Sequence, residues 1–96
     1  MICINPLKID DKTALGVKVD LPDSPPLLLV IGEKGFVMCG FLNMDAAEKL
    51  SVTAAMVRGV ETFDDVLDAE VREVTSKAQK RGIRAGMTGK EALKLL

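Results

Sequence analysis

The clearest pattern in the chain is a strict alternation of apolar and other side chains over residues 14–21. The large apolar side chains all fall in one phase, at Leu15, Val17, Val19 and Leu21, while Ala14, Gly16, Lys18 and Asp20 occupy the other. Successive side chains of a strand point to opposite faces, so this phase forms one apolar face. The segment is therefore predicted to be a half-buried strand.

The segment before it, residues 2–9, carries apolar side chains in both phases, with Ile2 and Ile4 in one phase and Leu7 and Ile9 in the other. Pro6 lies at the change of phase, and its missing N–H suits an edge strand or a bulge. An edge strand with two apolar faces and unpaired backbone groups is a template for pairing with another chain. We therefore expect residues 1–21 to form an oligomerising β ribbon; the alternative is that later helices cover the second face.

Residues 27–60 are predicted to form the core of the sheet with one short helix. The apolar run 27–31 indicates a buried strand, and Gly32 to Gly35 turn the chain into a second strand at 36–42. A helix capped by Asn43 or Asp45 and an extended segment at 52–60 follow. Strand, helix and strand in this order predict one crossover unit, with the direction of the last strand left open.

Residues 61–96 carry helical signals. Thr62 and Asp65 have the spacing of a helix N-cap, and a longer helix is predicted from Asp68 to Gly82, with Val71, Val74, Thr75 and Ala78 as its inward stripe. Ile83 is placed to contact Ala78 in a Schellman motif. The last helix is expected to begin at Thr88, in a capping box with Glu91.

Together these elements predict a single α+β domain over residues 1–96. Its expected architecture is an N-terminal, mostly antiparallel β-sheet with an edge ribbon, one strand-helix-strand crossover, and C-terminal helices packed on the sheet. No internal repeat is visible in the chain.

Composition excludes several classes of function. With 13 basic and 14 acidic residues and a formal net charge of -1, the chain has no overall field that attracts nucleic acid or an anionic membrane. Acids gather in residues 61–73 and bases in residues 77–94, which indicates helix-dipole complementation or a basic patch for an anionic partner. The absence of His excludes imidazole catalysis within one chain, and three Phe without Tyr or Trp argue against base stacking.

The two cysteines, Cys3 and Cys39, form no C-x-x-C pair, which argues against a zinc site and a thioredoxin-like motif. A secreted domain of this length usually carries more cysteines. The chain shows no signal-peptide pattern at its start, and its longest apolar run is too short to cross a bilayer. We therefore expect a soluble cytoplasmic protein, and no cofactor is predicted.

Two glycine-containing motifs are better explained by structure than by ligand binding. The segment from Gly86 to Lys90 lacks the first glycine and the final Ser or Thr of a P-loop. Gly32 and Gly35 match the G-x-x-G of RNA-binding KH domains, but they join two strands, so a hairpin with a glycine at positive φ is expected.

Cys39 and Arg58 are the candidate site residues. Cys39 lies in an apolar strand and is either a buried small hydrophobe or a thiol activated by Lys34 or Arg58 beside Gly40. Arg58 is the only charge in residues 54–60 and is followed by Gly59. Its guanidinium is expected to pair with Glu61 or an acid of another subunit, or to bind a ligand.

A set of ordered motifs resembles one family. These are the glycine hairpin after residues 27–31, Met38-Cys39-Gly40, Arg58-Gly59-Val60, residues 62–67 and residues 85–93. Together they resemble the YunC-like family of small uncharacterised bacterial and archaeal proteins. The resemblance implies an N-terminal β region used for tetramerisation, and it implies no activity, cofactor or catalytic residue.

Two functions follow as hypotheses. The first is a cytoplasmic homo-oligomeric module, expected as a tetramer through its N-terminal β region, that binds a protein or a small ligand. The second is a small enzyme or ligand-binding protein with a site between subunits. This second site is expected to bring Lys34, Cys39 and Arg58 together near Gly40 and Gly59.

Overall fold

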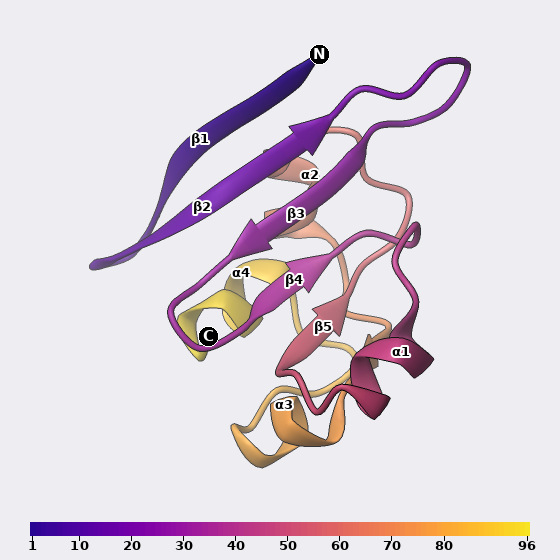
Figure 1. Cartoon of the computed structure of the whole chain (residues 1–96). Helices are drawn as coiled ribbons and strands as arrows, with labels where there is room; N and C mark the ends of the chain where they lie inside the picture. Colours follow the sequence, from indigo (N-terminus) through magenta and orange to yellow (C-terminus); the bar gives the residue numbers. More distant parts are fainter.

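Six strands form one sheet in the order in which they occur in the chain, and the first five are labelled in Figure 1. The computed structural model describes all 96 residues. The strands are β1 (Ile2–Ile9), β2 (Lys12–Val19), β3 (Leu27–Ile31), β4 (Phe36–Met38), β5 (Ala54–Met56) and β6 (Glu73–Val74). The helices are α1 (Met44–Lys49), α2 (Phe63–Asp68), α3 (Ser76–Lys80) and α4 (Gly89–Lys94). All strand pairs are antiparallel except β4 and β5, so the predicted α+β architecture is confirmed.

The β1–β2 ribbon runs without a bulge, in unbroken register from Ile2 opposite Val19 to Ile9 opposite Lys12. Asp20 N donates to Met1 O at 2.9 Å, so the odd-numbered residues of β1 exchange hydrogen bonds with β2. The backbone groups of its even-numbered residues therefore face the free edge of the sheet. Pro6 is one of these, and its missing N–H costs no bond within the ribbon.

One face of the sheet is covered by α2 and α4, which lie behind it in Figure 1. The main core lies between them, and it includes Leu28, Val30, Val37 and Ala55 of the sheet and Val66, Ala92 and Leu93 of the helices. Gly16 on this face leaves room for a helix side chain, because a Cβ there would lie 2.8 Å from the Phe63 ring.

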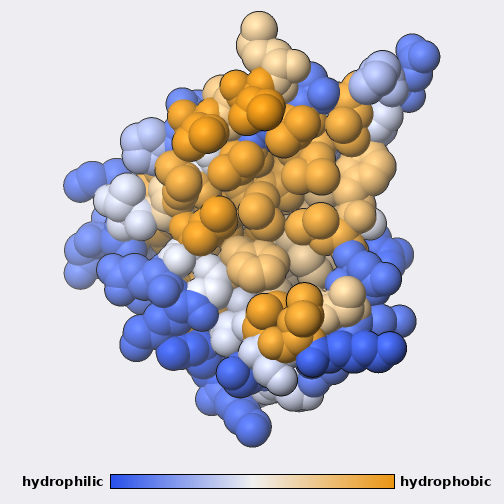
Figure 2. All heavy atoms as spheres, viewed as in Figure 1, coloured by the Kyte–Doolittle hydropathy of each residue, from blue (hydrophilic) through white to orange (hydrophobic).

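The opposite face is covered only at β4 and β5. There α1 contributes Ala47 to a smaller cluster with Met38 and Met56. No helix covers β1, β2 and β3 on this side, where strand pairing aligns nine apolar side chains in three rows of three: Ile2, Val19, Leu27; Ile4, Val17, Leu29; Pro6, Leu15, Ile31. We call these nine side chains the open face, and Figure 2 shows them as a continuous hydrophobic surface.

The alternative that helices cover the second face of the ribbon is wrong. Ile2 and Ile4 are 66% and 59% exposed, and Leu15 is 41% exposed. The apolar phase of residues 14–21 points to the open face, whereas Ala14 and Gly16 lie on the helix side. The alternation thus identified an apolar face correctly, but within one chain that face is only partly buried.

The hairpin between β3 and β4 forms as predicted, for a different reason. Neither Gly32 nor Gly35 has a positive φ. A Cβ at Gly35 would instead overlap the carbonyl oxygen of Thr53, and one at Gly32 would lie 2.8 Å from the backbone of Leu96. Close packing against other segments therefore requires these glycines.

The predicted crossover is confirmed, and β4 and β5 pair in parallel. Asn43 caps α1, accepting at Oδ1 from Asp45 N at 2.8 Å. Glu48 forms no capping box. Its Oε1 accepts from Ser76 N at 2.8 Å, which lowers the pKa of this carboxyl. The strand predicted at 52–60 shortens to β5.

The C-terminal capping motifs are also confirmed. Thr62 and Asp65 form a capping box at the start of α2, and Thr88 and Glu91 form one at the start of α4. Ile83 N donates to Ala78 O at 3.1 Å, the long bond of the Schellman motif. No helix is long and apolar enough to span a membrane.

The long helix predicted from Asp68 to Gly82 is wrong. Val71 N donates to Met87 O at 2.7 Å and Arg72 N to Met56 O at 2.8 Å, so these amides bond to distant segments. The chain then forms β6 against β5 and begins α3 only after Thr75. Short-range spacing could not reveal this because the inward stripe is divided among a loop residue, β6, the N-cap Thr75 and the five-residue α3.

Thr75 is the buried polar residue that joins these pieces. Its Oγ1 accepts from Ala54 N at 3.1 Å and from Ala78 N at 3.3 Å, so one hydroxyl serves both β5 and the α3 cap. We expect Thr75→Val to lower the free energy of unfolding by about 2 kcal/mol, because two buried amides lose their acceptor. Urea denaturation measures this loss. Thr75→Ser, which keeps the hydroxyl, is the control, and equal loss in both variants would contradict the assignment.

Candidate functional site

A pocket of about 320 Å³ opens beyond the carboxyl ends of the parallel strands β4 and β5. Nine residues line it: Pro25, Pro26, Cys39, Gly40, Phe41, Arg58, Gly59, Val60 and Glu61. They belong to three segments that are far apart in the sequence, residues 25–26, 39–41 and 58–61, and the sheet brings these segments together. Ligands of α/β proteins commonly bind outside the carboxyl ends of parallel strands, where chain segments diverge.

The pocket arises because the backbone ladder ends there. Val57 N still donates to Met38 O at 2.9 Å, and Cys39 N to Leu28 O at 3.1 Å. Beyond these bonds, one segment turns at Gly40 toward α1 and the other turns at Gly59, whose φ is 70°. This left-handed conformation favours glycine, which has no Cβ.

The divergence leaves backbone donors without partners in the chain. The N–H groups of Gly40, Phe41, Arg58, Gly59 and Val60 donate no hydrogen bond to any atom of the protein. All five residues line the pocket. A ligand there would meet several amides that nothing else within the chain satisfies.

Arg58 is the cation of this site. Its Nη2 lies 3.4 Å from Oε2 of Glu73 on β6, rather than pairing with Glu61 as one interpretation predicted. Both side chains are more than half exposed, so the pair contributes at most about 1 kcal/mol. The guanidinium therefore remains available to an acceptor in the solvent.

Cys39 forms the inner wall of the pocket. It is 4% exposed and belongs to the main core, and its Sγ accepts from Leu28 N at 3.3 Å. This environment supports its interpretation as a buried small hydrophobe. No charged side chain of the chain donates to the sulfur.

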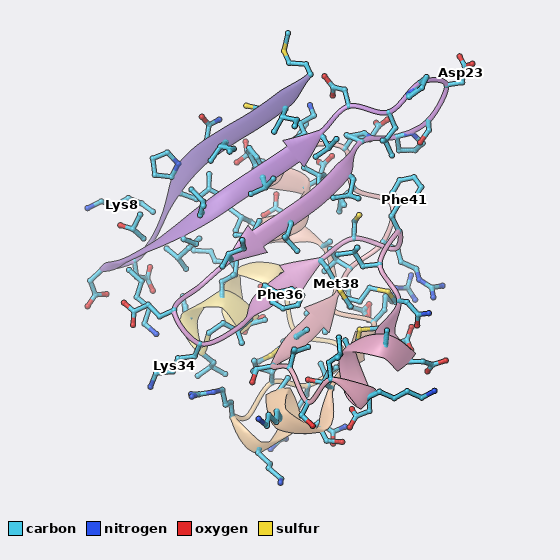
Figure 3. The ribbon with its side chains drawn as sticks, in the orientation of Figure 1. Lys8, Asp23, Lys34, Phe36, Met38 and Phe41 are labelled. Atoms are coloured by element: carbon cyan, nitrogen blue, oxygen red, sulfur yellow. The ribbon has the colours of Figure 1, made fainter.

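Lys34 is the candidate residue that the fold separates from the others. It lies in the β3–β4 hairpin, at the end of β4 opposite to Phe41 (Figure 3). Cys39, Gly40, Arg58 and Gly59 all line the pocket. Four of the five residues singled out in the sequence are thus brought together.

Sequence reasoning missed the apolar wall formed by Pro25, Pro26, Phe41 and Val60. The two prolines directly precede the apolar run 27–31 and belong to no motif that marks a pocket. Phe41 is 52% exposed. Its position in an apolar segment that follows a buried strand does not reveal this exposure. No group of three or more potential acidic or thiol ligands is placed to hold a metal ion.

Comparison with known proteins agrees with the resemblance noted in the motifs. The family described as "Domain of unknown function (DUF1805)" matches residues 38–96. The uncharacterised protein YunC of Bacillus subtilis is 33% identical, and the match covers 97% of this chain and 95% of YunC. A crystal structure of a protein of unknown function from Thermoplasma acidophilum superposes with a TM-score of 0.92 at 39% identity, covering 98% of this chain and 91% of the other.

The buried position of Cys39 makes a prediction about thiol reactivity. We expect iodoacetamide to label the exposed Cys3 of the native protein and to label Cys39 only when the chain unfolds, because alkylation requires access to the thiolate. Mass spectrometry of digested protein measures both rates. Cys3→Ser isolates the second thiol, and native labelling of Cys39 as fast as in urea would contradict its structural role.

Proposed function

The chain belongs to this YunC-like DUF1805 family, and we propose that it works as a cytoplasmic homo-oligomeric module that assembles through the open face and binds a protein or small ligand. The open face is the observation that carries the proposal. Contiguous exposed apolar surface of this kind is rare on monomers and marks an interaction site.

The composition of the open face favours a second copy of the same chain as its occupant. None of its nine side chains is charged or polar. A two-fold symmetric contact places the same patch against itself, so an uncharged face meets an uncharged face. Sheets that pack face to face interdigitate side chains in this manner.

The energetics point in the same direction. Burying an Ile or Leu side chain completely contributes about 1.5–3 kcal/mol. Ile2 and Ile4 are each more than half exposed in the single chain, and Leu15 and Ile31 are each more than one third exposed. Each of these is present twice in a symmetric interface, so packing two faces offers a substantial driving force.

The free edge of β1 is a poorer interface than its face. Pro6 places a nitrogen without a proton at the middle of the outward row of backbone groups. A partner strand would lose a hydrogen bond there, which is a common protection of edge strands. We therefore assign the first contact to the open face, and expect the tetramer implied by the family resemblance to be a dimer of such dimers.

The cytoplasmic part of the proposal rests on the thiols. Cys3 is exposed and Cys39 is buried, and both are free. Proteins that keep free thiols are typical of reducing compartments.

The second candidate function is a small enzyme or ligand-binding protein with a site around Cys39 and Arg58 that two subunits share. The pocket wall favours this arrangement, since Pro25 and Pro26 directly precede Leu27 of the open face. A copy packed on the open face would lie close to the pocket. Native mass spectrometry of freshly purified protein would detect a retained ligand together with the subunit number.

The assembly is tested by a charge placed in the open face. We expect Ile4→Lys to convert the oligomer to monomers of 10.3 kDa at micromolar concentration, because two lysines would be buried without partners at a symmetric contact. Size-exclusion chromatography with light scattering measures the mass. The fold should survive, since Ile4 is 59% exposed on an edge strand.

Leu50→Lys is the matched control. Leu50 follows α1, is 74% exposed and lies outside the open face, so its replacement should leave the oligomer unchanged. A wild-type protein that already elutes as a monomer would refute the assembly. An Ile4→Lys variant that keeps the wild-type mass would refute the assignment of the interface.

A further inference from the structure

We propose that the pocket beyond β4 and β5 binds the carboxylate of a small monoanionic organic molecule, whose apolar part lies against the proline wall. This inference deepens the proposed ligand role of the pocket and does not depend on the assembly of copies through the open face.

The donors in the pocket define the chemistry of the bound group. Five lining residues have N–H groups without an acceptor in the chain, and the carbonyl groups of the same residues have no donor in the chain. Arg58 adds a fork of guanidinium donors that matches the geometry of a carboxylate. The guanidinium, which carries donors only, selects a ligand group with acceptors only, and a carboxylate is such a group.

Gly40 keeps the approach to these donors open. Its φ is not positive, so the backbone does not require glycine there. A Cβ built on Gly40 would meet only Cγ of Arg58, at an ordinary 3.6 Å. Packing within the chain thus leaves Gly40 unexplained, whereas close approach of a ligand to the backbone explains it.

The acids near the pocket limit the charge of the ligand. Glu61 lines the pocket, and Glu73 contacts the Arg58 guanidinium at 3.4 Å. Both acids repel an anion, and they repel a doubly charged phosphate more strongly than a singly charged carboxylate. Glu73 is also a competitor, because it occupies part of the guanidinium that the ligand would use.

The apolar wall defines the rest of the ligand. Pro25, Pro26, Phe41 and Val60 line the pocket together with the donors. A volume of about 320 Å³ suits a small metabolite rather than a polymer. Binding sites for such molecules commonly combine apolar walls with a few convergent polar groups.

The test is a titration of the ¹⁵N-labelled protein with benzoate, followed by amide chemical shifts. Benzamide has the same ring without the charge, and sulfate is the dianionic probe. We expect saturable benzoate shifts at the amides of Gly40, Phe41, Arg58, Gly59 and Val60, and weaker binding of both other probes by about tenfold.

Three variants separate the contributions. Arg58→Gln should weaken benzoate by about tenfold, because a charged hydrogen bond is lost. Glu73→Gln should strengthen it severalfold by releasing the guanidinium. Gly40→Ala should weaken it while leaving the urea midpoint at least as high as in the wild type, since the new methyl group fits within the chain.

Each outcome is decisive. Equal binding of benzoate and benzamide would overturn the carboxylate assignment while supporting the ligand role of the pocket. If none of the three probes causes a saturable shift at these amides, both the carboxylate assignment and the ligand role of the pocket are overturned. An affinity that is unchanged in Arg58→Gln and Glu73→Gln would place the anion elsewhere and refute the inference.

Discussion

A sheet with two apolar faces and too little helix to cover both is the constraint on which this structure depends. The four helices contain only five or six residues each. Helices α2 and α4 cover one face, and α1 reaches only β4 and β5 on the other. Five of the nine side chains of the open face are exposed and the other four are only half-buried, and this deficit is the physical reason to expect a second copy.

The crossover between β4 and β5 has a separate consequence. A parallel pair requires the chain to return to the same end of the sheet, and α1 makes that return. Both strands therefore end on the same side, and their backbones separate beyond Met38 and Met56. Backbone amides without partners in the chain, Gly59 with its positive φ and the exposed Arg58 all lie where the strands separate. The site is a product of topology, since no single motif encodes it.

Local chemistry was predictable from the sequence. The capping boxes at Thr62 and Thr88 and the Schellman motif at Gly82 depend on residues within a few positions of each other, and all three form. The glycine hairpin also forms, although close packing against Thr53 and Leu96, which no local pattern reveals, is what requires glycine there.

Non-local structure was harder to predict. The apolar spacing of Val71, Val74 and Ala78 matches a helix, but the amides of this region bond to Met56 and Met87. Likewise, alternation in β2 identifies an apolar face without saying whether helices reach it. At the site, Arg58 and Gly40 could be singled out by their unusual positions, whereas the proline wall and the partner Glu73 come from segments that only the fold brings together.

The central claim is that the open face is covered by another copy of the chain, and small-angle X-ray scattering of the unmodified protein tests it most directly. A single chain has a radius of gyration of 12.2 Å. At micromolar concentration, we expect forward scattering that corresponds to a multiple of the 10.3 kDa mass of one chain. The radius of gyration should be clearly larger than that of one chain. Scattering that fits a lone chain of 12.2 Å, independent of concentration, would contradict the account.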